Sequence, residues 1–153
     1  MRISAKVDYA VRAAVELAAH EEDERLTTSD EIAENQDIPH AFLTNILQSL
    51  RQAGLVTSKR GPVGGHKLAK PAKEIVIADV IRAIDGPLAG VSGAHPEELD
   101  FVGSAKPLQD VWIAVRANLR EILEKVTLAD VAEDDLPKIV EKRAADEDAW
   151  VSR

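Results

Sequence analysis

The sequence has no cysteine and few aromatic residues among its 153 residues. Without cysteine it has no disulfide, no thiolate nucleophile, no cysteine-based zinc site and no all-cysteine iron-sulfur cluster. Aromatic residues make up 3% of the chain and hydrophobic residues 45%, so the core must consist mainly of Ala, Val, Ile and Leu. This composition is typical of helices packed on helices, and we expect a mainly α fold.

The sequence also has no apolar run of the ~20 residues that cross a bilayer. The first 22 residues are interrupted by Arg12 and Glu16, which predicts an amphipathic helix rather than a signal peptide. We therefore expect a cytoplasmic protein. The length fits one domain, or one domain with an appended arm.

Acidic residues outnumber basic ones by 27 to 19, which gives a formal net charge of -8. This charge argues against general affinity for nucleic acid, but its distribution is uneven. Residues 84–153 carry 15 acidic and 8 basic side chains, whereas residues 1–83 carry 12 and 11. The 36 residues from 38 to 73 contain six basic side chains and no acidic one. This segment predicts a local electropositive surface suited to nucleic acid.

Hydrophobic spacing and end signals predict three helices before residue 55. The first covers residues 6–20. A capping-box pattern at 28–31 opens the second, and residues 35–37 break it. The third has Pro39 in its first turn and Gly54 as its stop. Four apolar residues of the third helix lie on one face and are expected in the core: Leu43, Ile46, Leu47 and Leu50.

The next segment predicts two short strands, 55–58 and 66–69, joined by a glycine-rich turn. A helix over 77–84 follows. This order is that of a winged helix-turn-helix domain, here expected over residues 1–85, with the hairpin as its wing.

The C-terminal half begins with a flexible loop over residues 86–107, which holds four of the eight glycines and three of the seven prolines. A long helical pattern follows, and we expect a dimerisation helix over residues 108–131, in which a capping pattern at 127–131 restarts a helix. A charged tail is expected over 132–153. Apolar residues spaced 4, 3, 4, 3, 4 form a coiled-coil seam; the alternative is packing within the subunit. The predicted dimer interface is Leu108, Trp112, Val115, Leu119, Ile122 and Val126.

A winged helix-turn-helix that binds DNA lays its third helix in the major groove. Asn and Gln side chains can pair with adenine, Arg with guanine, and Ala with a thymine methyl group. Lys59 and Arg60 would meet phosphates, and the backbone amides of Thr28 and Ser29 could hold a phosphate at a helix N-terminus. The residues expected to face outward from the third helix include His40, Ala41, Thr44, Asn45, Gln48 and Arg51.

Four segments occur in a familiar order and spacing: MRISAKVDYAVRA, IAENQDIPHAFLTNILQSLRQAGLVTSKRGPVGGHKL, IADVIRAIDGPL and TLADV. Over about residues 1–131 the chain resembles the Rrf-type bacterial transcription regulators, which include the iron-sulfur cluster regulator, the nitric oxide sensing repressor and the cysteine metabolism repressor. The resemblance implies a homodimer that reads a partly palindromic operator. It also implies DNA contacts at Thr28, Ser29, Pro39, Ala41, Phe42, Asn45, Arg51, Arg60, Gly64, Gly65 and His66.

The chain departs from its relatives at the sensing loop. Many relatives hold an iron-sulfur cluster on three cysteines before the long helix, and residues 86–107 contain none. The resemblance is therefore to the cluster-free branch, with no metal or cofactor and with an effector that is a small ligand, a partner protein or nothing. The loop and Trp112 could line an effector pocket. A second departure is His66, which stands where an aromatic residue is usual.

The predicted function is a sequence-specific DNA-binding repressor. The alternative is an adaptor that docks a protein through its winged helix, which would lack salt-dependent DNA binding. An enzyme is not expected, because the sequence has no Gly-rich phosphate loop, no HExxH motif and no nucleophile elbow.

Overall fold

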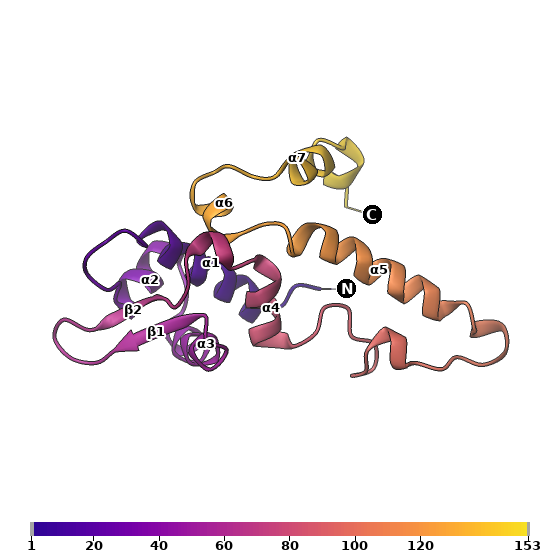
Figure 1. Cartoon of the computed structure of the whole chain (residues 1–153), viewed down its shortest axis with the longest axis horizontal. Helices are drawn as coiled ribbons and strands as arrows, with labels where there is room; N and C mark the ends of the chain where they lie inside the picture. The colour runs from indigo at the N-terminus through magenta and orange to yellow at the C-terminus, as the bar shows by residue number, and fades with distance from the viewer. Residues whose placement is uncertain (1, 153) are drawn as a thin grey trace.

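The computed structural model describes residues 2–152. It confirms a mainly helical fold with one two-stranded antiparallel hairpin. The helices α1 to α4, together with the hairpin, form a compact body, from which a loop runs outward and α5 returns (Figure 1). In chain order the helices and strands are α1 (Ala5–Ala19), α2 (Ser29–Gln36), α3 (His40–Gln52), β1 (Val56–Lys59), β2 (Gly65–Leu68), α4 (Ile77–Asp85), α5 (Leu108–Leu123), α6 (Leu128–Ala132) and α7 (Lys138–Ala144).

Side-chain caps fix where several helices begin. The Ser4 hydroxyl accepts a hydrogen bond from the Val7 amide at the start of α1. The capping box predicted from Thr28 to Glu31 is present at α2, and a second box at Thr127 opens α6. The second helix ends within the break predicted at residues 35–37, because the chain stays helical through Gln36 and leaves the helix at Asp37, which has a φ of 50°.

Helix α1 lies at the centre of the core and packs against α2, α3, α4 and α6. The four residues predicted for the inner face of α3 are all buried. They meet Leu17 of α1 and Ile32 of α2 in one cluster of aliphatic side chains. The small side chains of α1, including Ala10, Ala13 and Ala14, let the surrounding helices approach closely.

A buried carboxylate ties α1 to α2. Glu16 accepts hydrogen bonds from the Asn35 amide at 2.7 Å and from the Gln36 amide at 2.6 Å, both in the last turn of α2. Its other partner is His20, whose ring nitrogen lies 3.1 Å away. Burial raises the pKa of Glu16, but hydrogen bonds from Asn35, Gln36 and His20 outweigh burial and hold the pKa of this carboxyl below its usual value.

The predicted helix over 108–131 is divided in two. Helix α5 ends at Leu123, and the chain then turns so that Val126 accepts a hydrogen bond from the Ile77 amide. Val126 is only 6% exposed, so its assignment to the dimer interface is wrong. Leu128 of α6 is fully buried in the core of the body. The wrong prediction arose because Val126 continues the 4, 3 spacing after the helix has ended.

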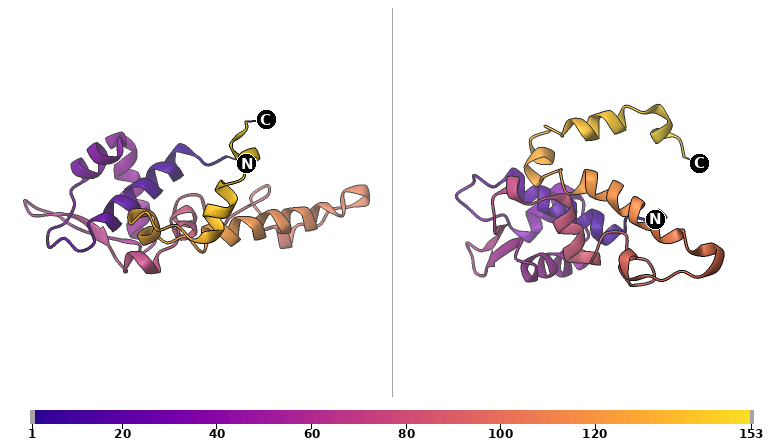
Figure 2. Two further views of the ribbon diagram at one scale, coloured as in Figure 1. Left: turned by 90° about the horizontal axis from the view of Figure 1, so that it is seen from above. Right: turned by 45° about the vertical axis from the view of Figure 1, so that its right-hand side comes forward.

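Figure 2 shows α5 as an arm beside the body, with α7 and the last turn standing apart from it. All 16 residues of α5 are described, and none of them is buried in the single chain. Residues 138–144 form a helix, and Glu147–Trp150 form a 3-10 turn, so the tail is structured. Among residues 2–152 we find no helix with the length and apolar content of a membrane span.

Candidate nucleic-acid interface

Helix α3 separates an apolar inner face from a polar outer face. Its predicted outward residues are all exposed in the structure, and the first turn also exposes Pro39 at the N-cap. Because these side chains are not needed for the core, they are available to meet a groove of DNA. The exposed side chains of this face are His40, Ala41, Phe42, Thr44, Asn45, Gln48 and Arg51.

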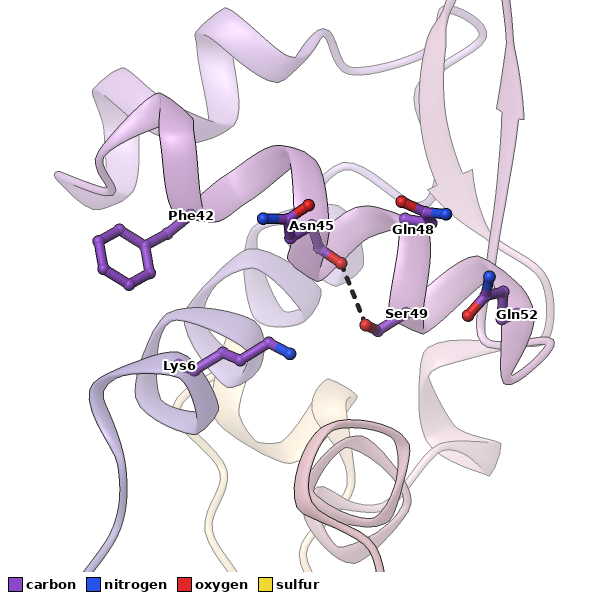
Figure 3. A pocket seen from close by; sticks show the side chains of 6 residues that line it. All are labelled: Lys6, Phe42, Asn45, Gln48, Ser49 and Gln52. Carbon is purple, nitrogen blue, oxygen red and sulfur yellow. Dashed lines mark hydrogen bonds between the residues drawn. The ribbon is translucent and has the colours of Figure 1, made fainter.

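A groove of about 440 Å³ lies between α3 and the start of α1. Figure 3 shows Lys6 of α1 extending toward α3, with the amides of Asn45, Gln48 and Gln52 above it. Ser49 lies between them and donates a hydrogen bond to the Asn45 carbonyl. The groove thus adds one cation and two polar side chains to the face predicted from sequence.

Three of these groove residues were absent from the sequence prediction. Ser49 and Gln52 follow Asn45 and Gln48 by one helical turn, and this i+4 spacing could have found them. Lys6 belongs to another helix, and no local pattern relates it to α3.

Phe42 packs on α1 and is also partly exposed. Its ring packs edge-on against Tyr9 of α1, with the ring centroids 5.6 Å apart. It nevertheless remains 46% exposed. The guanidinium of Arg12 lies over the Tyr9 ring, 4.8 Å from its centroid. Phe42 is therefore held in place by α1 while part of its ring stays accessible.

The wing is joined to the start of α2 by backbone pairing. The Thr27 amide donates to the His66 carbonyl at 3.1 Å, and the His66 amide donates to the Thr27 carbonyl at 2.8 Å. A Cβ atom on Gly65 would lie 2.7 Å from the Thr27 carbonyl oxygen, and one on Gly64 would lie 2.2 Å from that of Lys59. The fold of the hairpin itself therefore requires both glycines, whether or not DNA approaches them.

His66 connects the wing to α2 through its side chain as well. Its Nε2 atom lies 2.9 Å from the Ser29 hydroxyl, and its Nδ1 atom lies 2.7 Å from the Ser58 hydroxyl. Burial lowers the pKa of His66, and the positive charge of Arg51 lowers it further. The neutral ring donates to one hydroxyl and accepts from the other, which fixes Ser29 against the hairpin.

The predicted phosphate site at the N-terminus of α2 is wrong in one respect. The Thr28 amide donates a hydrogen bond to the Glu31 carboxylate at 2.8 Å, so this amide is occupied by the capping box. Hydrogen bonds from Arg25 and Thr28 lower the pKa of Glu31 to about 2. A carboxylate thus already sits where a phosphate was expected, because a capping box places its acidic side chain over the first amides.

The positive charge of the interface comes from the end of α3 and from the wing. Lys59 and Arg60 lie exposed where β1 meets the turn, and Lys67 of β2 and Arg51 of α3 are exposed as well. Segment 38–73 contributes no carboxylate. These cations can contact phosphates while the amides of α3 meet base edges.

The donors of residues 86–107 do not suit an iron-sulfur cluster. Clusters of this kind are held by cysteine thiolates, and the loop offers only His95, Glu97, Glu98 and Asp100. Over the part of the chain that the structure describes, no group of three or more His, Asp or Glu side chains is placed to hold a metal ion.

Comparison with known proteins relates the sequence and the fold to one family. The model of the Rrf2 family, described as an iron-dependent transcriptional regulator, matches residues 3–134. The chain is 49% identical over 146 residues to "Putative HTH-type transcriptional regulator Rv1287" of Mycobacterium tuberculosis strain H37Rv, covering 95% of this chain and 90% of that protein.

Solved structures support the same family assignment. The cysteine regulator CymR of B. subtilis superposes with a TM-score of 0.73 at 30% identity, covering 87% of this chain and 97% of that one. The T. potens IscR superposes with a TM-score of 0.68 at 31% identity, covering 100% and 93%. These relatives are named as regulators, not enzymes. The chain therefore belongs to the Rrf2 family and is a DNA-binding transcriptional regulator.

Proposed function

We propose that this regulator is a repressor that binds a partly palindromic operator as a homodimer and works without an iron-sulfur cluster. The observation that carries the proposal is the outer face of α3, exposed and free of acidic residues beside a basic wing. Asn45 and Gln48 suit base edges, and Arg60 suits a phosphate. A dimer bound across two half-sites of a promoter represses transcription by occluding the polymerase.

The uncovered apolar side of α5 supports the homodimer. Five of the six predicted seam residues lie on this helix, and none of them is buried in the single chain. Leu108, the first of them, is an exposed large hydrophobic residue. A helix that buries none of its residues in its own chain gains stability when a second copy covers it. Two-fold symmetry would place equivalent α3 helices in successive major grooves, about 34 Å or a multiple apart.

Fluorescence anisotropy tests the DNA-binding part of the proposal. The full chain is titrated onto labelled DNA from upstream of its own gene, with random DNA as competitor, at low and near-physiological salt. We expect preferential binding that weakens steeply with salt, because phosphate contacts release counterions. Salt-independent or absent binding would favour the adaptor alternative.

Two substitutions separate base recognition from charge. Asn45→Ala should cost about 1–3 kcal/mol on the operator and little on random DNA. Arg60→Ala should weaken binding to both DNAs and reduce the salt slope by about one. The matched control is Lys142→Ala, which removes a positive charge from α7, away from the interface. Equal losses on operator and random DNA for both interface variants would refute the assignment.

Sedimentation analysis tests the dimer. Leu119→Glu places a charge on the predicted seam, and we expect it to convert the dimer to a monomer. Asn118→Glu adds the same charge to the neighbouring exposed position and should leave the dimer intact. A wild-type monomer, or a dimer that survives Leu119→Glu, would contradict the use of α5.

A further inference from the structure

A cavity of about 300 Å³ lies at the junction of α4, the loop after it and α5. Its wall carries three guanidinium groups, from Arg82 of α4 and from Arg116 and Arg120 of α5, together with the ring of His95. No carboxylate among the described residues lines it. This is unexpected, because residues 84–153 carry almost twice as many acidic as basic side chains.

The arginines converge because of helix geometry. Arg116 and Arg120 are one turn apart on α5 and so share a face, and Arg82 lies in the last turn of α4, which packs against α5. Glu124 pairs with Arg82 and also lies 3.6 Å from Arg120, so two guanidinium groups share this carboxylate. Arg82 is also 3.6 Å from Asp79. These two acidic residues pair with the arginines, but neither of them lines the cavity.

Arg116 is the most buried cation of the group. Its side chain is 12% exposed, whereas that of its partner Glu97 is 54% exposed. A backbone amide hydrogen bond and the Arg116 guanidinium hold the pKa of Glu97 below its usual value. Because an exposed carboxylate gains little from such a pair, an incoming anion can replace Glu97 without leaving a buried charge unpaired.

The remaining wall is apolar. Pro87 and the buried Leu88 line the cavity on the side of the loop. Guanidinium groups bind carboxylate and phosphate oxygens in pairs of parallel hydrogen bonds, and an apolar wall favours a ligand with a carbon skeleton. A volume of about 300 Å³ is at the small end of ligand sites.

We propose that this cavity binds a small organic anion and that this anion is the effector of the regulator. Arg116 and Arg120 hold the anion through its carboxylate or phosphate group. Pro87 and Leu88 contact its carbon skeleton. The sequence-based hypothesis placed Trp112 in the wall of an effector pocket, but Trp112 does not line this cavity. The effector role rests on the proposed function.

The position of the cavity links the ligand to DNA binding. Helix α4 belongs to the body that carries α3, and α5 carries the proposed dimer seam. A ligand that bridges Arg82 to the arginines of α5 changes the angle between the two parts, and hence the spacing of the two recognition helices in a dimer. By thermodynamic reciprocity, operator DNA changes the affinity of the ligand by the same factor.

Isothermal titration calorimetry on the full chain without DNA tests the site independently of operator binding. The probes are inorganic phosphate, glycerol 3-phosphate and succinate, each at an ionic strength matched with sodium chloride. We expect one of the organic probes to bind with a Kd of about 1 mM or lower. Comparing glycerol 3-phosphate with succinate shows whether the site prefers a phosphate or a carboxylate group. Comparing glycerol 3-phosphate with inorganic phosphate measures what the carbon skeleton adds to the affinity.

Substitutions locate the binding. Arg116→Gln and Arg120→Gln should each weaken the probe about tenfold or more, whereas Glu97→Gln should strengthen it by removing the competing carboxylate. Arg143→Gln, on α7 near Glu121, is the matched control and should bind as wild type. Circular dichroism verifies that each variant is folded, and the more exposed Arg120 provides a second variant if Arg116→Gln does not fold.

Three results overturn the proposal. The first is that every probe binds with a Kd above about 10 mM or does not bind at all. The second is that both arginine variants bind the probe as tightly as the wild type does. The third is binding that leaves operator affinity unchanged, which removes the effector role. Failure to bind an operator at all, with the calorimetric result intact, would instead refute the proposed function.

Discussion

The hydrogen bonds to Glu16 predict a specific loss of stability when its charge is removed. Glu16→Gln keeps the size of the side chain but replaces one acceptor oxygen by an NH₂ group, which then faces an amide donor of α2. Hydrogen bonds to a charged group contribute about 1.5–3 kcal/mol, and a buried donor left unpaired costs about 1–3 kcal/mol. Since Asn35 is exposed and can turn to water, we expect a loss of about 2–4 kcal/mol in the free energy of unfolding.

The loss should depend on pH in a defined direction. Because the folded pKa of Glu16 lies below the usual 4.5, its carboxylate stabilises the fold above pH 4.5, and this contribution disappears as the pH falls through the folded value. Glu16→Gln has no carboxylate at this position, so it has no such contribution to lose when the pH falls. Its stability should therefore fall less than that of the wild type below pH 4.5.

Urea unfolding followed by circular dichroism at pH 7 and near pH 4 measures both effects. The matched control is Glu34→Gln, which removes an exposed acidic charge from α2 and should change stability by less than about 0.5 kcal/mol. The reasoning would be refuted if Glu16→Gln unfolded at the same urea concentration as the control at pH 7.

Three further outcomes are expected. Gly65→Ala should destabilise the fold by about 1–3 kcal/mol, because the new Cβ would meet the Thr27 carbonyl and because the backbone φ of 151° disfavours any residue but glycine. Thermal unfolding measures this loss, and Gly90→Ala, whose Cβ has room, should show no comparable loss. Burial lowers the pKa of His66 below 6.5, so its contribution is present above pH 6.5 and is lost as the pH falls through the folded value; His66→Phe should flatten that part of the stability profile, and an unchanged profile would contradict this role. Anaerobically purified protein should contain no stoichiometric iron and no cluster absorption, and either signal would refute the cluster-free proposal.

Much of α3 could be predicted from the sequence because its signals are local. The spacing of Leu43, Ile46, Leu47 and Leu50 defines one face at 3.6 residues per turn, and the opposite face follows without knowledge of the rest of the fold. The capping box from Thr28 to Glu31 is equally local. The same box, however, uses the Thr28 amide, which the sequence-based phosphate site had required to be free.

The end of α5 shows where periodicity stops being informative. Val126 keeps the spacing of the seam, but the chain turns before it and pairs with the segment that precedes α4. The spacing of apolar residues gives no information about the pairing of residues 126–128 with a segment about fifty residues earlier in the chain. Burial of Leu128 in the core decides the outcome, because apolar area removed from water outweighs one more turn of exposed helix.

The sequence by itself determined the helix-turn-helix, the wing, the absence of cysteine chemistry and the acid-free stretch from 38 to 73. Each depends on composition or on neighbours a few residues apart. Only the tertiary structure decided that Lys6 joins the α3 face, that His66 fixes Ser29 to the wing, and that Arg82 meets Arg116 and Arg120 around one cavity. These contacts join residues distant in the chain, and their geometry depends on how the whole core packs.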